Sequence, residues 1–255
     1  MHRIRRGIIT ALFLYLWVLA LFFGVALLAG LNFIPASYNG IAQDAVVLLG
    51  VIAFNRWIAH VPVHWWNGRQ LGTQLRQALP ALIVVGVLCS ANVAKLVHLP
   101  LSGLVVRYLG YVLLIGITEE YVFRGVLIPL LARTWPRRPL LVVLLSSALF
   151  GGLHLINSSH IALTYVLPQI LFAMALGTFF AGLYVRTRNL LLPILLHAAT
   201  DISVVVQLVE HPTSSANLNI EPQLSLIIAA VYGGLLVIAL VVASRQVRGI
   251  QISTD

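Results

Sequence analysis

The stretch "GYVLLIGITEEYVFRGVLIPLL", residues 110–131, places three charged side chains inside a long apolar run. These side chains are Glu119, Glu120 and Arg124, and apolar sequence flanks them on both sides. About 20 apolar residues in a helix cross the hydrocarbon core of a bilayer. A charged side chain at the centre of such a span costs on the order of 3 kcal/mol even on lenient insertion scales. The stretch therefore predicts a membrane-spanning helix that carries a functional site.

The composition of the whole chain favours the same class of protein. Of its 255 residues, 60% are hydrophobic and 9% are charged, whereas soluble domains have about 25% charged residues. Hydropathy predicts eight spans, at 8–31, 41–59, 78–97, 104–131, 140–157, 161–185, 189–209 and 223–244. We expect an all-α, polytopic membrane helix bundle of about eight transmembrane helices, formed by a single integral membrane domain over residues 1–255.

The basic residues indicate the orientation of this bundle. Apart from Arg124, thirteen Lys and Arg residues fall on one side of the predicted spans, and only Lys95 and Arg107 fall on the other. Because Lys and Arg accumulate in cytoplasmic loops, both termini are predicted to be cytoplasmic. The net charge of +9 comes from short clusters between apolar runs, a pattern that favours lipid headgroups as partners and argues against nucleic acid.

One cytoplasmic connection combines aromatic, histidine and arginine residues. The segment "HVPVHWWNGRQLGTQLR", residues 60–76, follows Trp57 and contains Trp65 and Trp66. Tryptophan rings are enriched at the headgroup level of membranes. We expect a short helix along the membrane surface, with membrane anchoring as its role and substrate capture as the alternative.

Six ionisable residues lie well inside the predicted spans. The other acidic residues, among them Asp44, are assigned to loops or span ends. At a rise of 1.5 Å per residue, four of them, Glu119, His154, His197 and Asp201, lie about 12–21 Å from the cytoplasmic ends of their spans. Three predicted helices thus bring polar groups to a similar depth, which permits one shared cavity. The six are Glu119, Glu120, Arg124, His154, His197 and Asp201.

Helical spacing separates the two glutamates. Arg124 lies about 40° from Glu120 around the helix but about 140° from Glu119. An i,i+4 ion pair between Glu120 and Arg124 is therefore predicted, and Glu119 is left without a partner on its own helix. His197 and Asp201 also have i,i+4 spacing. A purely structural set of buried ion pairs is the alternative to a functional site.

Three short motifs carry a resemblance to a known family. The sequences "EEYVFR" (119–124), "FGGLH" (150–154) and "HAATD" (197–201) resemble the Glu-Glu-x-x-x-Arg, Phe-x-x-x-His and His-x-x-x-Asn/Asp motifs of the CAAX protease and bacteriocin-processing (CPBP, ABI) family. The chain is similar there to type II CAAX prenyl endopeptidases. The resemblance implies an intramembrane endopeptidase in a prokaryotic cell membrane, with a site open to the cytoplasmic side and residues 104–209 as catalytic core.

The resemblance also implies a role for each matching residue. Glu119 and His154 would activate water, and His197 and Asp201 would bind the oxyanion. Asp201 stands where the prenyl-protein enzymes carry Asn, so it either is protonated or orients His197. This departure argues against assuming a prenylated substrate.

The chemistry of amide hydrolysis fits these residue types. The reaction needs a general base for water and a donor for the oxyanion. Glu119, His154, His197 and Asp201 could instead hold zinc. Because the single-helix His-Glu-x-x-His arrangement is absent, a glutamate mechanism without metal or other cofactor is favoured over a metalloprotease.

Two other functions remain as alternatives. Buried Glu, His and Asp residues also form the proton relays of membrane transporters. Such transporters often contain inverted repeats with broken helices, but Pro168 and Pro193 are not placed symmetrically. The second alternative is a catalytically silent membrane immunity or scaffold protein, which would not need every polar group. Hydrolysis of a membrane-associated protein or peptide is the favoured function.

Overall fold

The computed structural model describes residues 2–29, 35–159, 161–210 and 220–252, and all regular elements within them are helical. The predicted connections around 30–34 and 211–219 lie outside these residues. The α-helices are α1 (His2–Ala29), α2 (Asn39–Phe54), α3 (Leu71–His98), α4 (Gly103–Glu120), α5 (Ile128–Ala132), α6 (Pro139–Leu153), α7 (Leu163–Thr187), α8 (Leu191–Thr200), α9 (Ile202–Glu210) and α10 (Pro222–Gln246). Two 3₁₀ segments, η1 (Ala36–Tyr38) and η4 (His154–Ser159), and two π-helical segments, η2 (Asn55–Ala59) and η3 (Tyr121–Leu127), complete them. The prediction of an all-α bundle is confirmed.

Seven of the described helices are long and apolar enough to cross a membrane. They are Gly7–Leu28, Asn39–Ala59, Leu71–His98, Pro139–Ser159, Leu163–Thr187, Leu191–Glu210 and Pro222–Gln246. The chain is therefore an integral, multi-pass membrane protein.

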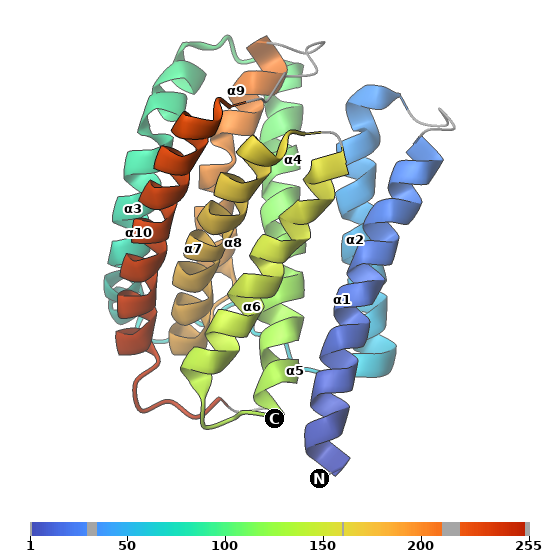
Figure 1. Cartoon of the computed structure of the whole chain (residues 1–255), viewed down its shortest axis with the longest axis vertical. Coiled ribbons are helices and arrows are strands. Elements are labelled where there is room, and N and C mark those ends of the chain that lie inside the picture. Colours follow the sequence, from blue (N-terminus) through green and yellow to red (C-terminus); the bar gives the residue numbers. More distant parts are fainter. Residues whose placement is uncertain (1, 30–34, 160, 211–219, 253–255) are drawn as a thin grey trace.

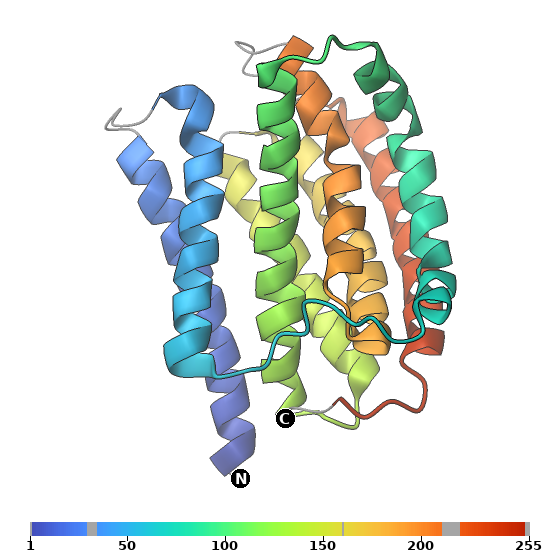
Figure 2. The same cartoon turned by 180° about the vertical axis from the view of Figure 1, so that it is seen from behind.

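The predicted span 104–131 is the one that these seven do not include. It corresponds to α4, η3 and α5, which follow one another without interruption from Gly103 to Ala132. This helix extends along the bundle beside the others (Figure 2). It carries four charged residues, Arg107, Glu119, Glu120 and Arg124, whereas the most apolar 18-residue window of each of the seven other helices contains at most two.

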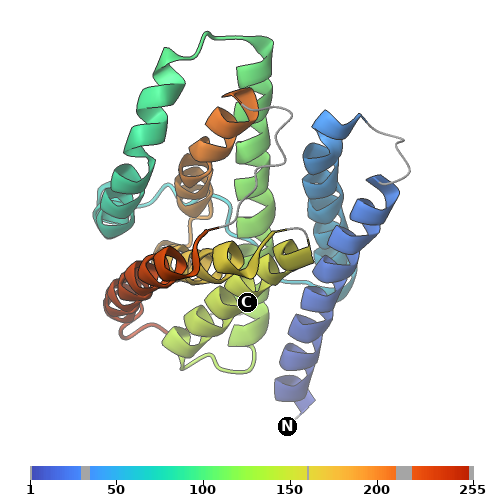
Figure 3. The same cartoon turned by 45° about the horizontal axis from the view of Figure 1, so that its top comes forward.

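α7 is the most buried of the seven candidate membrane-spanning helices. This helix packs most extensively against α10 and α6, and two thirds of its most apolar window, 67%, is buried, against 11% for α10. The apolar side chains that α10 leaves exposed, such as Leu226 and Ile227, suit contact with lipid. α1 and α2 form a pair at one side of the bundle (Figure 3). α1 begins and α10 ends at the same end of the bundle (Figure 1).

A close approach between α4 and α8 brings the first and third motifs together. A Cβ atom on Gly116 would lie 2.9 Å from the carbonyl oxygen of Ile194 and 3.3 Å from the amide nitrogen of Ala198. Only glycine permits this approach. Glu119 and Glu120 follow one turn after Gly116, so the contact places them beside His197.

The segment 60–70 differs from the prediction. Residues 60–70 form no helix, and α3 begins only at Leu71, so the predicted surface helix over 60–76 is wrong at its start. The segment is held instead by backbone bonds to the start of α8: Leu190 donates to the His64 carbonyl at 2.9 Å, and Leu191 donates to that of Trp65 at 3.1 Å. Pro62 lacks an N–H and disfavours helix before it. Figure 2 shows this segment crossing in front of α4.

Candidate active site

The imidazole of His197 lies at the centre of the polar set. Its Nδ1 is 2.7 Å from Glu120 Oε1, and its Nε2 is 3.3 Å from Glu119 Oε2 and 3.6 Å from Asp201 Oδ2. The ring is buried. Both ring nitrogens face carboxylate oxygens, and the imidazolium form, which has two N–H donors, satisfies the contacts on both sides. Glu119, which lacks a partner on its own helix, thus finds one on α8.

The predicted ion pair between Glu120 and Arg124 is confirmed. Arg124 Nη1 lies 2.9 Å from Glu120 Oε1, and both side chains are fully buried at 0% exposure. Arg124 Nη2 also donates to the Gly177 carbonyl at 3.1 Å, and the guanidinium carbon lies 4.7 Å from the centre of the Phe150 ring. A Cβ atom on Gly177 would lie 3.2 Å from Nη2. α7 therefore supplies the space and the acceptor that the buried guanidinium needs.

The backbone changes its helical form directly after the glutamates. From Tyr121 to Leu127 the turn is π-helical, and Ile128 N–H donates to the Phe123 carbonyl, five residues earlier. Such π segments are rare and occur often at functional sites. Because the wider turn shifts the helix phase, a regular 3.6-residue period carried on from α4 does not predict which way the residues beyond this segment face.

His154 ends α6 and faces the site from the other side. Its Nδ1 lies 3.1 Å from the carbonyl oxygen of Phe150. A carbonyl oxygen can only accept a hydrogen bond, so Nδ1 carries a proton, and in the neutral ring Nε2 is then an acceptor. The Phe150 ring lies edge-on between the two imidazoles, with centroids 5.3 Å from His154 and 5.8 Å from His197. The second motif thereby fixes the orientation of both histidines.

A cavity of about 440 Å³ lies in front of Glu119 and His154. His197 and Asp201 do not line it; His197 contacts the cavity-lining Glu119 at 3.3 Å and Asp201 at 3.6 Å. The other lining residues come from α1, α2, α6, η4 and α7: Phe22, Phe23, Ala26, Gln43, Leu153, Ile156, Asn157, Ser159 and Gln169.

The position of this cavity bears on how a substrate enters. α1 ends, and α2 and α7 begin, at the end of the bundle remote from the start of α1 (Figure 1). The lining residues of α1, α2, η4 and α7 belong to this half. The resemblance implies a cytoplasmic opening, and the basic residues predict cytoplasmic termini. The residues that line this cavity lie toward the end of the bundle opposite the termini, and so differ in position from the cytoplasmic opening that the resemblance implies.

Asp44 is a residue of this region that the sequence did not assign to the site. It was placed at a span end, but in the structure it is buried in α2, at 6% exposure. Its carboxyl interacts with the Tyr111 hydroxyl and lies within electrostatic reach of Glu119 and Asp201. The Thr118 hydroxyl donates to the Asp44 backbone carbonyl at 3.3 Å. Hydropathy alone could not reveal this burial, because the covering groups come from α4.

The described residues contain no group of three or more His, Cys, Asp or Glu side chains placed to hold a metal ion. The alternative zinc set of Glu119, His154, His197 and Asp201 therefore does not form such a group in this structure. Both nitrogens of His197 already face carboxylates.

Comparison with known proteins identifies the segment that carries the motifs. Residues 100–203 match the family model described as Rce1-like, type II CAAX prenyl endopeptidase Rce1-like. Among curated proteins and among solved structures, none matches the chain. The matched residues contain all three motifs, so the resemblance to CAAX proteases is confirmed. The match supports a CAAX-type intramembrane protease, and hence a hydrolase.

Proposed function

Starting from the match of residues 100–203 to type II CAAX prenyl endopeptidases, we propose that the chain is an intramembrane endopeptidase. It hydrolyses a peptide bond of a membrane-associated protein or peptide with water that Glu119 and His154 activate. The observation that carries the proposal is that these two residues, from α4 and the end of α6, line one cavity inside the bundle. A water molecule there meets a carboxylate and an imidazole acceptor together.

The attack step follows from the hydrogen-bonding capacity of these groups. The Glu119 carboxylate accepts a proton from the water as the oxygen bonds to the carbonyl carbon of the substrate. The unprotonated Nε2 of His154 accepts the other hydrogen of the water and orients it. The π bond of the carbonyl opens, and negative charge develops on its oxygen.

His197 stabilises that negative charge. In the imidazolium form its Nδ1–H donates to Glu120, and its Nε2–H turns from Glu119 to the developing oxyanion. Asp201, 3.6 Å from Nε2, orients the ring. When the tetrahedral intermediate collapses, the C–N bond breaks and Glu119 returns its proton to the leaving amine. The products are a carboxylic acid and an amine.

The cavity restricts the class of substrate. Its walls combine apolar side chains, such as Phe22 and Leu153, with the amides of Gln43, Asn157 and Gln169. Such a lining suits an apolar peptide segment whose backbone groups need hydrogen-bond partners away from water. Membrane lipids and a membrane-associated peptide or protein are therefore the expected partners, and nothing in the lining requires a prenyl group.

Cleavage by the purified protein tests this function. The protein is reconstituted in liposomes with a library of membrane-inserted peptides, and the products are identified by mass spectrometry. An endopeptidase yields two fragments whose masses sum to that of the peptide plus one water. A proton-coupled transporter instead produces proton flux without fragments, and a silent scaffold produces neither. Either of these last results overturns the proposal.

A further inference from the structure

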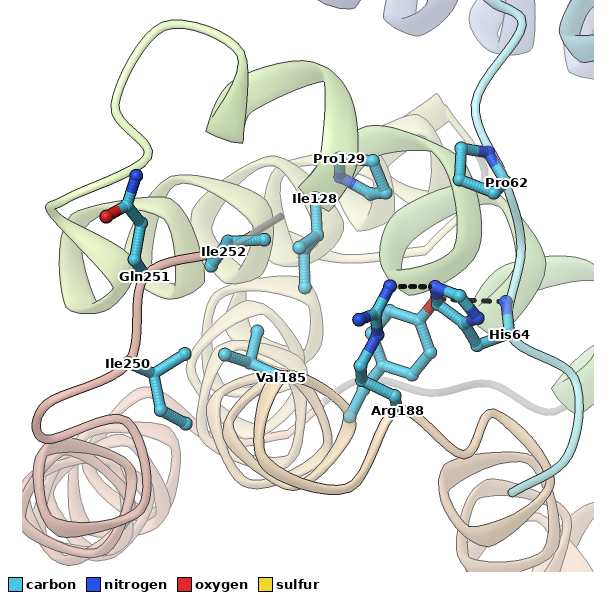
Figure 4. Close-up of a pocket in the computed structure, with 10 residues that line it drawn as sticks. Pro62, His64, Ile128, Pro129, Val185, Arg188, Ile250, Gln251 and Ile252 are labelled. Atoms are coloured by element: carbon cyan, nitrogen blue, oxygen red, sulfur yellow. Dashed lines mark hydrogen bonds between the residues drawn. The ribbon is translucent and has the colours of Figure 1, made fainter. Parts of the chain in front are cut away.

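A second, smaller cavity lies at the end of the bundle where α10 ends. It has a volume of about 90 Å³, room for about three water molecules. Four parts of the chain enclose it: the irregular segment 60–70, the start of α5, the end of α7, and the segment after α10. Figure 4 shows Arg188 and His64 side by side, with Ile128 and Val185 on one side of the pair and Ile250 beyond Val185. The site around Glu119 lies elsewhere, because no lining residue is shared.

Two basic side chains meet in this cavity without an acidic partner. Arg188 Nη2 makes a hydrogen bond with Nε2 of His64. No residue that lines the cavity is acidic, and within the described residues no carboxylate forms an ion pair with Arg188. Burial and the charge of Arg188 lower the pKa of His64. The guanidinium therefore retains unused donors and an uncompensated positive charge.

The backbone holds these groups in place. Arg188 has φ +49° and ends α7 in a left-handed conformation, which is costly for a residue with a side chain. The other non-glycine residues with positive φ in the described chain are His60 and Gln70, at the two ends of the segment that carries His64. The His64 N–H also donates to the Tyr184 hydroxyl at 3.4 Å. Left-handed residues thus bound both the segment that carries His64 and the helix end that carries Arg188.

We propose that this cavity is a binding site for a phosphate group, held by Arg188 and His64. The planar guanidinium fork matches the oxygens of a phosphate, and the cavity has room for one such group. The exposed rings of Trp65 and Trp66 place this part of the chain at headgroup depth. The apolar wall of Ile250, Ile252 and Ile128 suits the glycerol and upper acyl part of an anionic phospholipid.

Occupation of this site would reach the proposed active site through the segment 60–70. This segment bonds to the start of α8, and the Trp65 ring stacks on Tyr121 with centroids 5.2 Å apart. Tyr121 directly follows Glu120, and α8 carries His197. A bound phosphate therefore stabilises the elements that position the site, whether or not the chain proves to be a protease.

Thermal unfolding of the purified full chain in an uncharged detergent tests the site. The probes are dioctanoyl phosphatidylglycerol, inorganic phosphate and dioctanoylglycerol, all at one ionic strength. We expect phosphatidylglycerol to raise the unfolding temperature saturably. Arg188→Gln and His64→Gln should each raise the half-saturating concentration about tenfold or more, the size expected for a lost hydrogen bond to a charged group. Arg186→Gln, an exposed arginine outside the cavity, is the matched control and should bind as the parent does.

The comparison of probes identifies the source of the phosphate. A response to phosphatidylglycerol alone assigns the site to a lipid headgroup, and a response to inorganic phosphate as well assigns it to the phosphate group itself. An equal response to dioctanoylglycerol would overturn the proposal, because only apolar contact would then be involved. The proposal also fails if Arg186→Gln weakens binding as much as Arg188→Gln, or if no probe changes the unfolding temperature. None of these readouts depends on proteolysis.

Discussion

Glu119 and Glu120 are adjacent in the sequence, but their surroundings differ. Glu120 is fully buried between Arg124 and His197, at 2.9 and 2.7 Å. Glu119 lines the large cavity and contacts His197 at 3.3 Å. One carboxylate therefore completes a buried network, while the other is open to a reactant. This difference is the basis on which the proposed function assigns a structural role to Glu120 and a chemical role to Glu119.

Substitution of each glutamate by glutamine should separate these roles in thermal unfolding. Glu120→Gln removes the charge that balances Arg124, and breaking a buried pair in this way costs roughly 3–5 kcal/mol. We expect a clear fall in the unfolding temperature in detergent and a lower yield. Glu119→Gln should unfold at a temperature close to that of the parent, because its amide still lines the cavity. The assignment is wrong if Glu120→Gln is as stable as the parent and Glu119→Gln is the variant that collapses.

Activity should depend on Asp201 as a hydrogen-bonding group rather than as a fixed negative charge. Asn keeps the shape and can still contact His197, so Asp201→Asn should retain substantial turnover. Asp201→Ala should lose on the order of a hundredfold, the size expected for one lost contribution to oxyanion binding. Turnover of both variants is measured with and without a strong chelator.

The chelator arm distinguishes this role from metal ligation. An amide binds zinc far more weakly than a carboxylate, so a zinc ligand at Asp201 would not tolerate Asn. If Asp201→Asn is as inactive as Asp201→Ala and the chelator stops the parent, zinc replaces the glutamate mechanism.

Among the elements, α4 shows what sequence periodicity can and cannot predict. The i,i+4 pairs Glu120–Arg124 and His197–Asp201 are predictable because the first residue of each pair lies in a regular α-helix, α4 or α8. The π-helical turn from Tyr121 is not, since it depends on tertiary packing that buries every residue to Leu127. The burial of Asp44 is unpredictable for the same reason, because the residues that bury it belong to another helix, α4. Contacts between distant elements are the information that a 3.6-residue period lacks.

The segment 60–70 failed as a predicted helix for a related reason. Its Trp and Arg residues are typical of an interfacial helix, but its backbone bonds go to the start of α8 instead. These backbone hydrogen bonds join residues far apart in the sequence, so they are known only from the structure. Substrate capture by this segment stays untested, and its role in holding α8 gives it a function within the bundle.

The segment should make stability depend on pH through His64. Burial and the charge of Arg188 lower the pKa of His64 in the folded chain, so the unfolded chain binds the proton more readily. Stability is therefore lost as the pH falls through the ordinary imidazole value of 6.5 and toward the lower folded value. We expect the unfolding temperature to fall between pH 7 and pH 5, and His64→Gln to flatten part of that fall. His98→Gln, at the end of α3, is the control; if it flattens the curve equally, His64 is not the group responsible.

For the molecule as a whole, orientation in the membrane remains a prediction. α1 begins and α10 ends at the same end of the bundle (Figure 1), as an even number of crossings requires. Thirteen basic residues against two predict that this end is cytoplasmic. Reporter fusions after Arg6 and after Arg248 should both give cytoplasmic signals. Extracytoplasmic signals at both ends would show that the orientation is the reverse of the predicted one. Signals that differ between the two ends would contradict an even number of membrane crossings.

The fold class and the proximity of the charged residues of the three motifs were predictable from the whole sequence, while the cavity in front of Glu119 was not. Apolar run lengths and the order of three motifs suffice for an all-α bundle with Glu119, His154 and His197 at one depth. The cavity in front of Glu119 depends on how α1 and α2 pack beside α4 and η4. No spacing in the sequence determines that packing, so its location emerges only from the assembled helices.

The central claim, that Glu119 and His154 activate water within one cavity, is tested most directly by rates of peptide cleavage in liposomes. The parent is compared with Glu119→Gln and His154→Gln, and with Glu210→Gln as a matched change at the exposed end of α9. We predict that each site variant loses on the order of 10²–10⁴ in turnover, the usual contribution of acid–base catalysis, while Glu210→Gln cleaves at the parental rate. Parental turnover in folded Glu119→Gln would contradict the claim.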